Sequence, residues 1–218
     1  MSDSRVGDRY FDFLSDRAML SNIASPIQIY SIFANREYRT AYNCGVMDSA
    51  DMYVLLKIAS LRGRSDWTQG LLAAEIGVSP STVNRALKRA TNAKLYHPSS
   101  KNLNLRSLEE ALVHGSRFFL APEQGGESRG TPTAWAAPPL DAEIASSDSL
   151  PPVWPHPLGE TRGLSVEPLH PSAPKVALRD PDFYAVLALV DALRLGDNRE
   201  RDLARKELHR IFSLRGED

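Results

Sequence analysis

Residues 69–90, QGLLAAEIGVSPSTVNRALKRA, carry the most informative pattern in this sequence. In the first half, apolar residues recur at helical spacing and stop at Gly77, a residue that adopts the positive φ of a tight turn without steric cost. Ser79 and Pro80 then form a pair that favours the start of a helix, with serine as the N-cap and proline as the first helical residue. The stretch therefore predicts two short helices joined by a sharp corner.

The second of these helices has two chemically different faces. Val83, Ala86 and Leu87 face the first helix and are expected to be buried against it. The outward face carries four polar or basic residues: Ser81, Asn84, Arg85 and Lys88. Such side chains bond base edges and phosphates, so the pattern is that of a helix-turn-helix with an exposed recognition helix. An ordinary helical hairpin with a solvated polar face is the alternative.

Short apolar segments follow on either side of a polar turn. Residues 95–96 precede the turn of residues 97–102, and residues 103–105 follow it. Two strands at this place form a wing, and from here the sequence resembles winged helix-turn-helix transcription regulators of the MarR-like type. The resemblance implies that the wing tip approaches the minor groove or the DNA backbone, with Lys101 at the tip and Arg106 at the base.

Two further helices flank this region. A helix over residues 48–61 is predicted upstream, with Asp48 or Ser49 as its N-cap, and Asp66 or Thr68 is expected to cap the helix that follows it. Downstream, Ser107 and Glu110 have the spacing of a capping box at the start of another helix. The expected apolar face of that helix consists of Leu108, Ala111, Leu112, Phe118 and Phe119. This face packs either beneath the wing or against the same helix of a second subunit.

Length and composition place the chain among globular proteins. It has 218 residues, of which 42% are hydrophobic and 24% are charged. No apolar run reaches the roughly eighteen residues that a membrane span needs, and the N-terminus lacks the pattern of a signal peptide. We therefore expect a cytoplasmic protein without a membrane partner. The single cysteine, Cys44, excludes an intrachain disulfide and a multi-cysteine metal site.

The net charge of −1 conceals a strong asymmetry along the chain. Residues 57–106 contain nine basic and two acidic residues, a local charge of +7, whereas residues 107–160 contain two basic and eight acidic residues, a local charge of −6. Positive charge thus gathers where the helix-turn-helix lies, which is what binding to phosphates requires. The acidic segment is either a solvating surface or a partner for the basic face when DNA is absent.

The patterns predict a mainly α fold with a small β-wing. The expected parts are an N-terminal extension (1–46), a winged helix-turn-helix domain (47–120), a Pro/Gly-rich arm and linker (121–178) and a C-terminal helical pair broken at Gly196 (179–218). The pair is expected to form an interface or a core. Because the clear domain pattern begins at Met47, we hold as a hypothesis that the natural chain starts there.

The sequence favours a DNA-binding regulator over an enzyme. It contains no phosphate-binding glycine loop, nucleophile elbow or paired metal-ligand motif, so we predict no catalytic residue, metal or cofactor. The expected partner is double-stranded DNA, bound by a homodimer. The predicted contacts are Ser79, Ser81, Thr82, Asn84, Arg85, Lys88, Arg89, Lys101 and Arg106. A second interpretation is an antitoxin-like or adaptor protein that binds a partner protein through its C-terminal half and autoregulates its operon.

Overall fold

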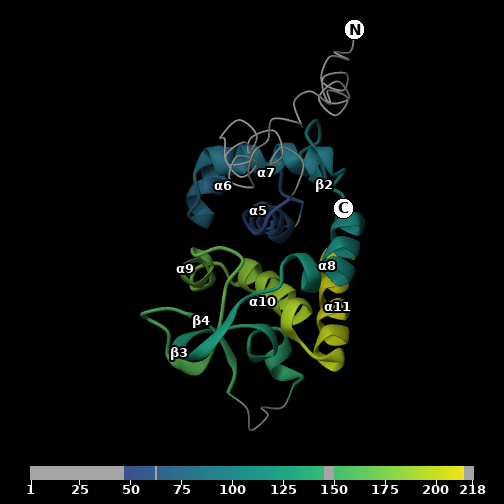
Figure 1. Cartoon of the computed structure of the whole chain (residues 1–218). Helices are drawn as coiled ribbons and strands as arrows, with labels where there is room; N and C mark the ends of the chain where they lie inside the picture. Colours follow the sequence, from purple (N-terminus) through teal and green to yellow (C-terminus); the bar gives the residue numbers. More distant parts are fainter. Residues whose placement is uncertain (1–46, 62, 145–149, 214–218) are drawn as a thin grey trace, which may run out of the picture. The chain divides into compact units, whose positions relative to one another are not determined.

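The structure, a computed structural model, describes residues 47–61, 63–144 and 150–213 (Figure 1). Contacts divide the chain after Val46, and residues 47–218 form one unit. The predictions for the N-terminal extension and for Cys44 concern residues outside the described ranges. The described part is a mixed α/β fold with seven α-helices, a two-stranded hairpin and a three-stranded sheet. The expected mainly α fold is therefore corrected, because the predicted arm folds into the sheet.

The first three helices of the described residues begin at the predicted caps. They are α5 (Ser49–Ser60), α6 (Gln69–Ile76) and α7 (Pro80–Asn92). Asp48 caps α5 in a capping box with Asp51, and the Thr68 hydroxyl caps α6 by accepting from an amide in its first turn. Gly77 ends α6 with φ of +70°, a left-handed conformation that residues with a Cβ adopt only with strain.

A short hairpin and a long helix follow α7. Strands β1 (Tyr96–His97) and β2 (Asn102–Leu103) pair antiparallel, and α8 spans Leu105–Phe119. The capping box predicted between Ser107 and Glu110 is wrong, because the side chain of Asn104 is the N-cap and accepts from the Ser107 amide at 3.1 Å. The N-cap consequently lies three residues earlier than predicted.

The apolar face predicted for α8 is only partly buried. Leu108 and Leu112 are fully buried, and α8 packs against the two C-terminal helices. Ala111 is exposed, and the side chains of Phe118 and Phe119 are 68% and 88% exposed. The two phenylalanines close the C-terminal end of the helix and are not part of the core.

The segment predicted as an arm folds into a small sheet. Strand β3 pairs antiparallel with both β4 and β5, and β4 and β5 pair in parallel, so that each strand touches the other two. Two 3₁₀ turns and a short helix complete the segment. The elements are β3 (Gln124–Pro132), η1 (Ala134–Ala136), η2 (Leu140–Ala142), β4 (Pro152–Pro155), β5 (Thr161–Val166) and α9 (Ala173–Ala177).

Two glycines allow the three strands to approach one another closely. A Cβ on Gly130 would lie 2.0 Å from the carbonyl oxygen of Trp154, and one on Gly163 would lie 2.0 Å from the carbonyl oxygen of Pro151. Neither backbone oxygen can retreat without breaking strand pairing. The glycine content that disfavoured a helix in this segment is thus a requirement of the sheet.

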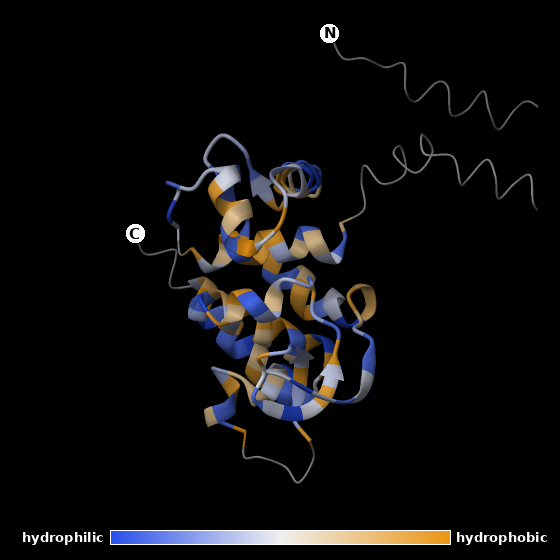
Figure 2. Ribbon diagram, turned by 90° about the vertical axis from the view of Figure 1, so that its left-hand side faces the viewer, coloured by the Kyte–Doolittle hydropathy of each residue, from blue (hydrophilic) through white to orange (hydrophobic). Residues whose placement is uncertain are grey.

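The C-terminal helices α10 (Pro181–Leu195) and α11 (Asn198–Ser213) are separated at Gly196, as predicted. Of the two settings expected for this pair, the structure shows a core for α10. Helix α10 packs against α5, α8, α9, α11 and η1, and its side chains are buried on several sides. Figure 2 shows hydrophobic residues gathering on the helices in the middle of the described part.

A buried polar cluster joins α10 to the sheet segment. The carboxylate of Asp191, 1% exposed, accepts from the Thr133 hydroxyl at 2.8 Å and from the Trp154 indole at 2.6 Å, and it pairs with the Arg194 guanidinium. Arg194 also donates to the carbonyl oxygen of Leu120. Burial raises the pKa of Asp191, whereas Arg194 and the two neutral donors act in the opposite direction. These contacts fix η1 and β4 on α10.

Candidate nucleic-acid interface

Helix α7 is buried on one side and exposed on the other. Its side chains Val83, Ala86 and Ala90 are completely buried against α5 and α6. Ser81, Arg85 and Lys88 on the other side are exposed. In Figure 1, α6, α7 and β2 lie at the upper end of the described part, and β3 and β4 lie at the lower end. Helix α5, on which the buried side of α7 packs, lies between α7 and the sheet in this view.

Arg89 does not belong to this outward face. Its side chain is 6% exposed, and its Nη1 atom lies 2.7 Å from a carboxylate oxygen of both Asp48 and Asp51. Burial acts to raise the pKa of Asp48, but the Asp51 amide and the Arg89 guanidinium outweigh it and hold that pKa below its ordinary value. Arg89 therefore anchors α7 to the start of α5, which removes it from the predicted DNA contacts.

Three hydroxyls gather at the N-terminus of α7. The Ser79 hydroxyl accepts from the Thr82 amide at 3.1 Å, and it lies 2.8 Å from the Ser81 hydroxyl and 2.9 Å from the Thr82 hydroxyl. Ser79 and Ser81 are exposed, and Thr82 is half-buried. Three of the predicted contacts thus lie together at a helix N-terminus, where the helix dipole favours negative charge.

An open groove of about 430 Å³ lies between α7 and the β1–β2 hairpin. Asn84, Lys88 and Thr91 line it from α7, and Lys101 lines it from the hairpin. Gln69, the first residue of α6, also lines the groove, and its Oε1 atom accepts from Asn84 Nδ2 at 3.2 Å. Gln69 is not among the contacts that the sequence predicts. The sequence signal that could have indicated Gln69 is a long polar side chain directly after the Thr68 cap.

The two residues assigned to the wing occupy different surroundings. Lys101 Nζ donates to the carbonyl oxygens of Ser65 and Trp67 at 3.4 and 3.3 Å and lies 5.6 Å from the centre of the Trp67 ring. Lys101 thus holds the hairpin against the loop before α6, although its side chain remains exposed. Arg106 is 90% exposed at the start of α8 and lies 3.5 Å from Glu110.

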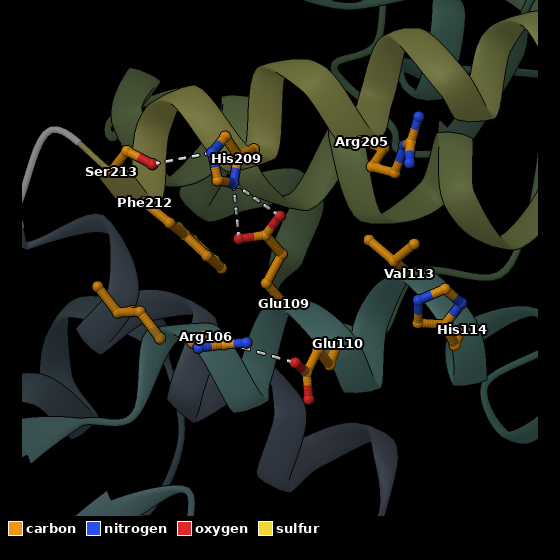
Figure 3. Close-up of a pocket in the computed structure, with 10 residues that line it drawn as sticks. Arg106, Glu109, Glu110, Val113, His114, Arg205, His209, Phe212 and Ser213 are labelled. Atoms are coloured by element: carbon orange, nitrogen blue, oxygen red, sulfur yellow. Dashed lines mark hydrogen bonds and ion pairs between the residues drawn. The ribbon is translucent and has the colours of Figure 1, made fainter.

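A second hollow, of about 440 Å³, lies between α8 and α11 (Figure 3). There His209 Nδ1 lies 3.0 Å from a carboxylate oxygen of Glu109, and His209 Nε2 lies 3.3 Å from the Ser213 hydroxyl. A nucleophile, a base and an orienting carboxylate stand in the same order in some hydrolases. However, the His209 side chain is 67% exposed, so water competes for both ring nitrogens. These contacts therefore act as a surface clamp between the two helices.

A larger cleft, of about 960 Å³, lies between the start of α5, the end of α8 and the sheet. Phe119 lines it, together with several prolines and other apolar residues. Three of its lining residues, Asp48, Glu123 and Glu167, are acidic, and Arg194 is basic. Asp48 is paired with Arg89, and Arg194 is paired with Asp191, so Glu123 and Glu167 carry the remaining acidic charge. The cleft is thus apolar with an acidic character, unlike the groove beside α7.

In residues 47–61, 63–144 and 150–213, no three potential metal-binding side chains come together. In the same part of the chain, no helix has the length and apolar character that crossing a membrane requires. Comparisons with protein-family models, with curated proteins and with solved structures give no significant match to this chain.

Proposed function

We propose that this protein is a sequence-specific regulator that binds double-stranded DNA at promoters in the cytoplasm through α7 and the adjacent wing. The observation that carries the proposal is the two-sided character of α7. Its inner side is fully buried, while Ser81, Arg85 and Lys88 are exposed on its outer side. Such a helix can enter the major groove without disturbing the core.

Each predicted contact other than the buried Arg89 has a role that suits its place. Arg85 and Asn84 read base edges, because arginine pairs well with guanine and asparagine with adenine. Lys88 and the hydroxyls at the N-terminus of α7 bind phosphates, and Arg106 and Lys101 approach the backbone beside the wing. Residues 57–106 carry a local charge of +7 in the sequence. Lys57 and Arg89 are paired with carboxylates outside this segment, and the remaining positive charge favours this mode of binding.

A homodimer is part of the proposal. The exposed pair Phe118 and Phe119 at the end of α8 provides an apolar anchor of the kind that becomes buried in protein interfaces. In a dimer, two recognition helices would bind two half-sites, so the operator would be a palindrome or a near-palindrome.

Fluorescence anisotropy on the promoter fragment of the protein's own gene and on scrambled DNA, across salt concentrations, tests DNA binding. We expect tighter binding to the native fragment, and Arg85→Ala should lose about 1–3 kcal/mol of specific binding. Arg199→Ala is the matched control, because Arg199 is an exposed arginine on α11. Equal binding to both DNAs, or no binding, would contradict the proposal.

A second candidate function is the recruitment of a partner protein, as in an antitoxin-like protein or an adaptor. The observation that favours it is the 960 Å³ cleft, which has apolar walls, an acidic character and the exposed Phe119 at its edge. The partner that suits it presents an apolar segment flanked by basic residues.

The mass of the purified protein in solution distinguishes self-association through Phe118 and Phe119 from partner binding through Phe119. A dimer that becomes a monomer in Phe118→Ser/Phe119→Ser supports self-association through the end of α8. A monomeric wild-type protein contradicts the homodimer, and it favours the partner-binding function if a basic protein encoded beside its gene co-purifies with it in a Phe119-dependent manner.

A further inference from the structure

We infer that Gln69, on α6, holds the side-chain amide of Asn84 in the orientation that reads adenine in the major groove. This inference rests on the proposed DNA binding and adds a positioning residue that the recognition helix itself does not contain. The observation behind it is the hydrogen bond of 3.2 Å from Asn84 Nδ2 to Gln69 Oε1, at the edge of the groove between α7 and the wing.

The hydrogen-bonding capacity of Asn84 explains the role of this contact. An asparagine amide has two N–H donors and one carbonyl acceptor. Gln69 takes one donor, which leaves Asn84 with one N–H and its carbonyl oxygen. Adenine presents an acceptor, N7, and a donor, the N6 amino group, at its major-groove edge. The two remaining groups of Asn84 match that edge in number and kind.

The contact also fixes the orientation of the pair before DNA arrives. Gln69 begins α6 directly after the Thr68 cap, and α6 and α7 are locked together through the fully buried Leu72, Ile76 and Val83. Both partners therefore stand on rigid backbone. A side chain held in its binding rotamer loses less conformational entropy when it binds. A free asparagine on an exposed helix would sample several rotamers and read the base less selectively.

Neighbouring charges favour DNA at this position. Lys88 lies one turn after Asn84 on the same face of α7 and lines the same groove. Asn84 is half-buried and Lys88 is exposed, and both line the groove. A base edge approached by Asn84 would thus have its phosphate close to a positive charge.

Selection from a random-sequence DNA library tests the inference with four variants of the full chain. Asn84→Ala should abolish the preference at one A·T position, a loss of about 10-fold or more in relative affinity for that base. Gln69→Met, which keeps length but lacks the acceptor, should weaken the preference at the same position and leave other positions unchanged. Gln69→Glu keeps an acceptor and should therefore keep the preference at that position, although its negative charge lowers the affinity for all sequences. The double variant Gln69→Met/Asn84→Ala should match Asn84→Ala.

Three outcomes separate the possibilities. If Gln69→Met keeps the full preference at the position that depends on Asn84, the positioning role is overturned while DNA reading by α7 stands. If Gln69→Met changes the preference at a different position, Gln69 reads a base itself and the inference is again overturned. If the wild-type protein selects no motif, the proposed function fails, and the inference fails with it.

Discussion

The two ends of the described molecule use polar residues in opposite ways. At the end formed by α5, α6 and α7, the side chains of Ser81, Arg85 and Lys88 lie outward, and the caps of the three helices bond amides three residues away. At the sheet end, Asp191 is buried and bonds Thr133 and Trp154, which lie 58 and 37 residues away in sequence. The outward residues of α7 can therefore contact a ligand without a loss of fold stability, whereas the polar residues beneath the sheet hold the fold together.

The largest effect is expected from Asp191→Ala. The substitution leaves the buried guanidinium of Arg194 and the donors of Thr133 and Trp154 without their acceptor. Removing one partner of a buried ion pair typically costs ~3–5 kcal/mol, so the free energy of unfolding should fall by that amount in urea denaturation.

The exposed Asp202 provides the control for this prediction. It lies 3.8 Å from Arg205 on the surface of α11, and exposed ion pairs of this kind contribute about 0–1 kcal/mol. If Asp191→Ala and Asp202→Ala destabilise the protein equally, the buried cluster does not distinguish the sheet end.

The second prediction compares two arginines on α7. Arg89→Ala leaves the carboxylate of Asp51 buried without its counter-charge. The substitution should lower the free energy of unfolding by about 3 kcal/mol. Arg85→Ala should change stability by no more than about 0.5 kcal/mol, because Arg85 is exposed. Thermal unfolding without DNA measures both. A stability loss in Arg85→Ala that equals that of Arg89→Ala would contradict the division of α7 into an anchoring and a free side.

The same contrast explains which parts of the fold the sequence predicts. Helices α5, α6 and α7 depend on signals that lie close together, such as the Ser79–Pro80 start and the positive φ of Gly77. Such signals can be read directly from the sequence. Arg89 was misassigned because the carboxylates that bind it, Asp48 and Asp51, lie about forty residues earlier.

The sheet could not be predicted for the corresponding reason. Strands β3, β4 and β5 have few alternating apolar residues, and their pairing depends on contacts such as Gly130 against the backbone of Trp154. Composition alone suggests an arm, because glycine and proline usually indicate turns and loops. The strand pairing that uses them here becomes visible only in the structure. Gln69 was missed similarly, because only the packing of α6 on α7 brings it to Asn84.

A smaller effect is expected from Ser79→Ala. The Ser79 hydroxyl caps α7 by accepting from the Thr82 amide, and loss of an N-cap costs about 1 kcal/mol. Ser81→Ala is the control, since Ser81 is exposed and provides no cap. Urea denaturation of the two variants should separate them, and equal stabilities would show that the local cap does not determine the start of α7.

The smallest effect concerns His170, which lies at the junction between the two ends. Its ring stacks on Tyr53 of α5 with centroids 4.9 Å apart, and its Nδ1 accepts from the Ser172 amide at 3.2 Å. Burial lowers the pKa of His170, so the folded state binds the proton less readily than the unfolded state does. The stability that depends on the neutral ring is present above the ordinary pKa of about 6.5 and is lost as the pH falls below it. His170→Gln should flatten the fall in melting temperature between about pH 7 and pH 5, whereas His114→Gln, which alters an exposed ring on α8, should leave it unchanged. An identical pH dependence in all three proteins would mean that the junction does not respond to the charge of His170.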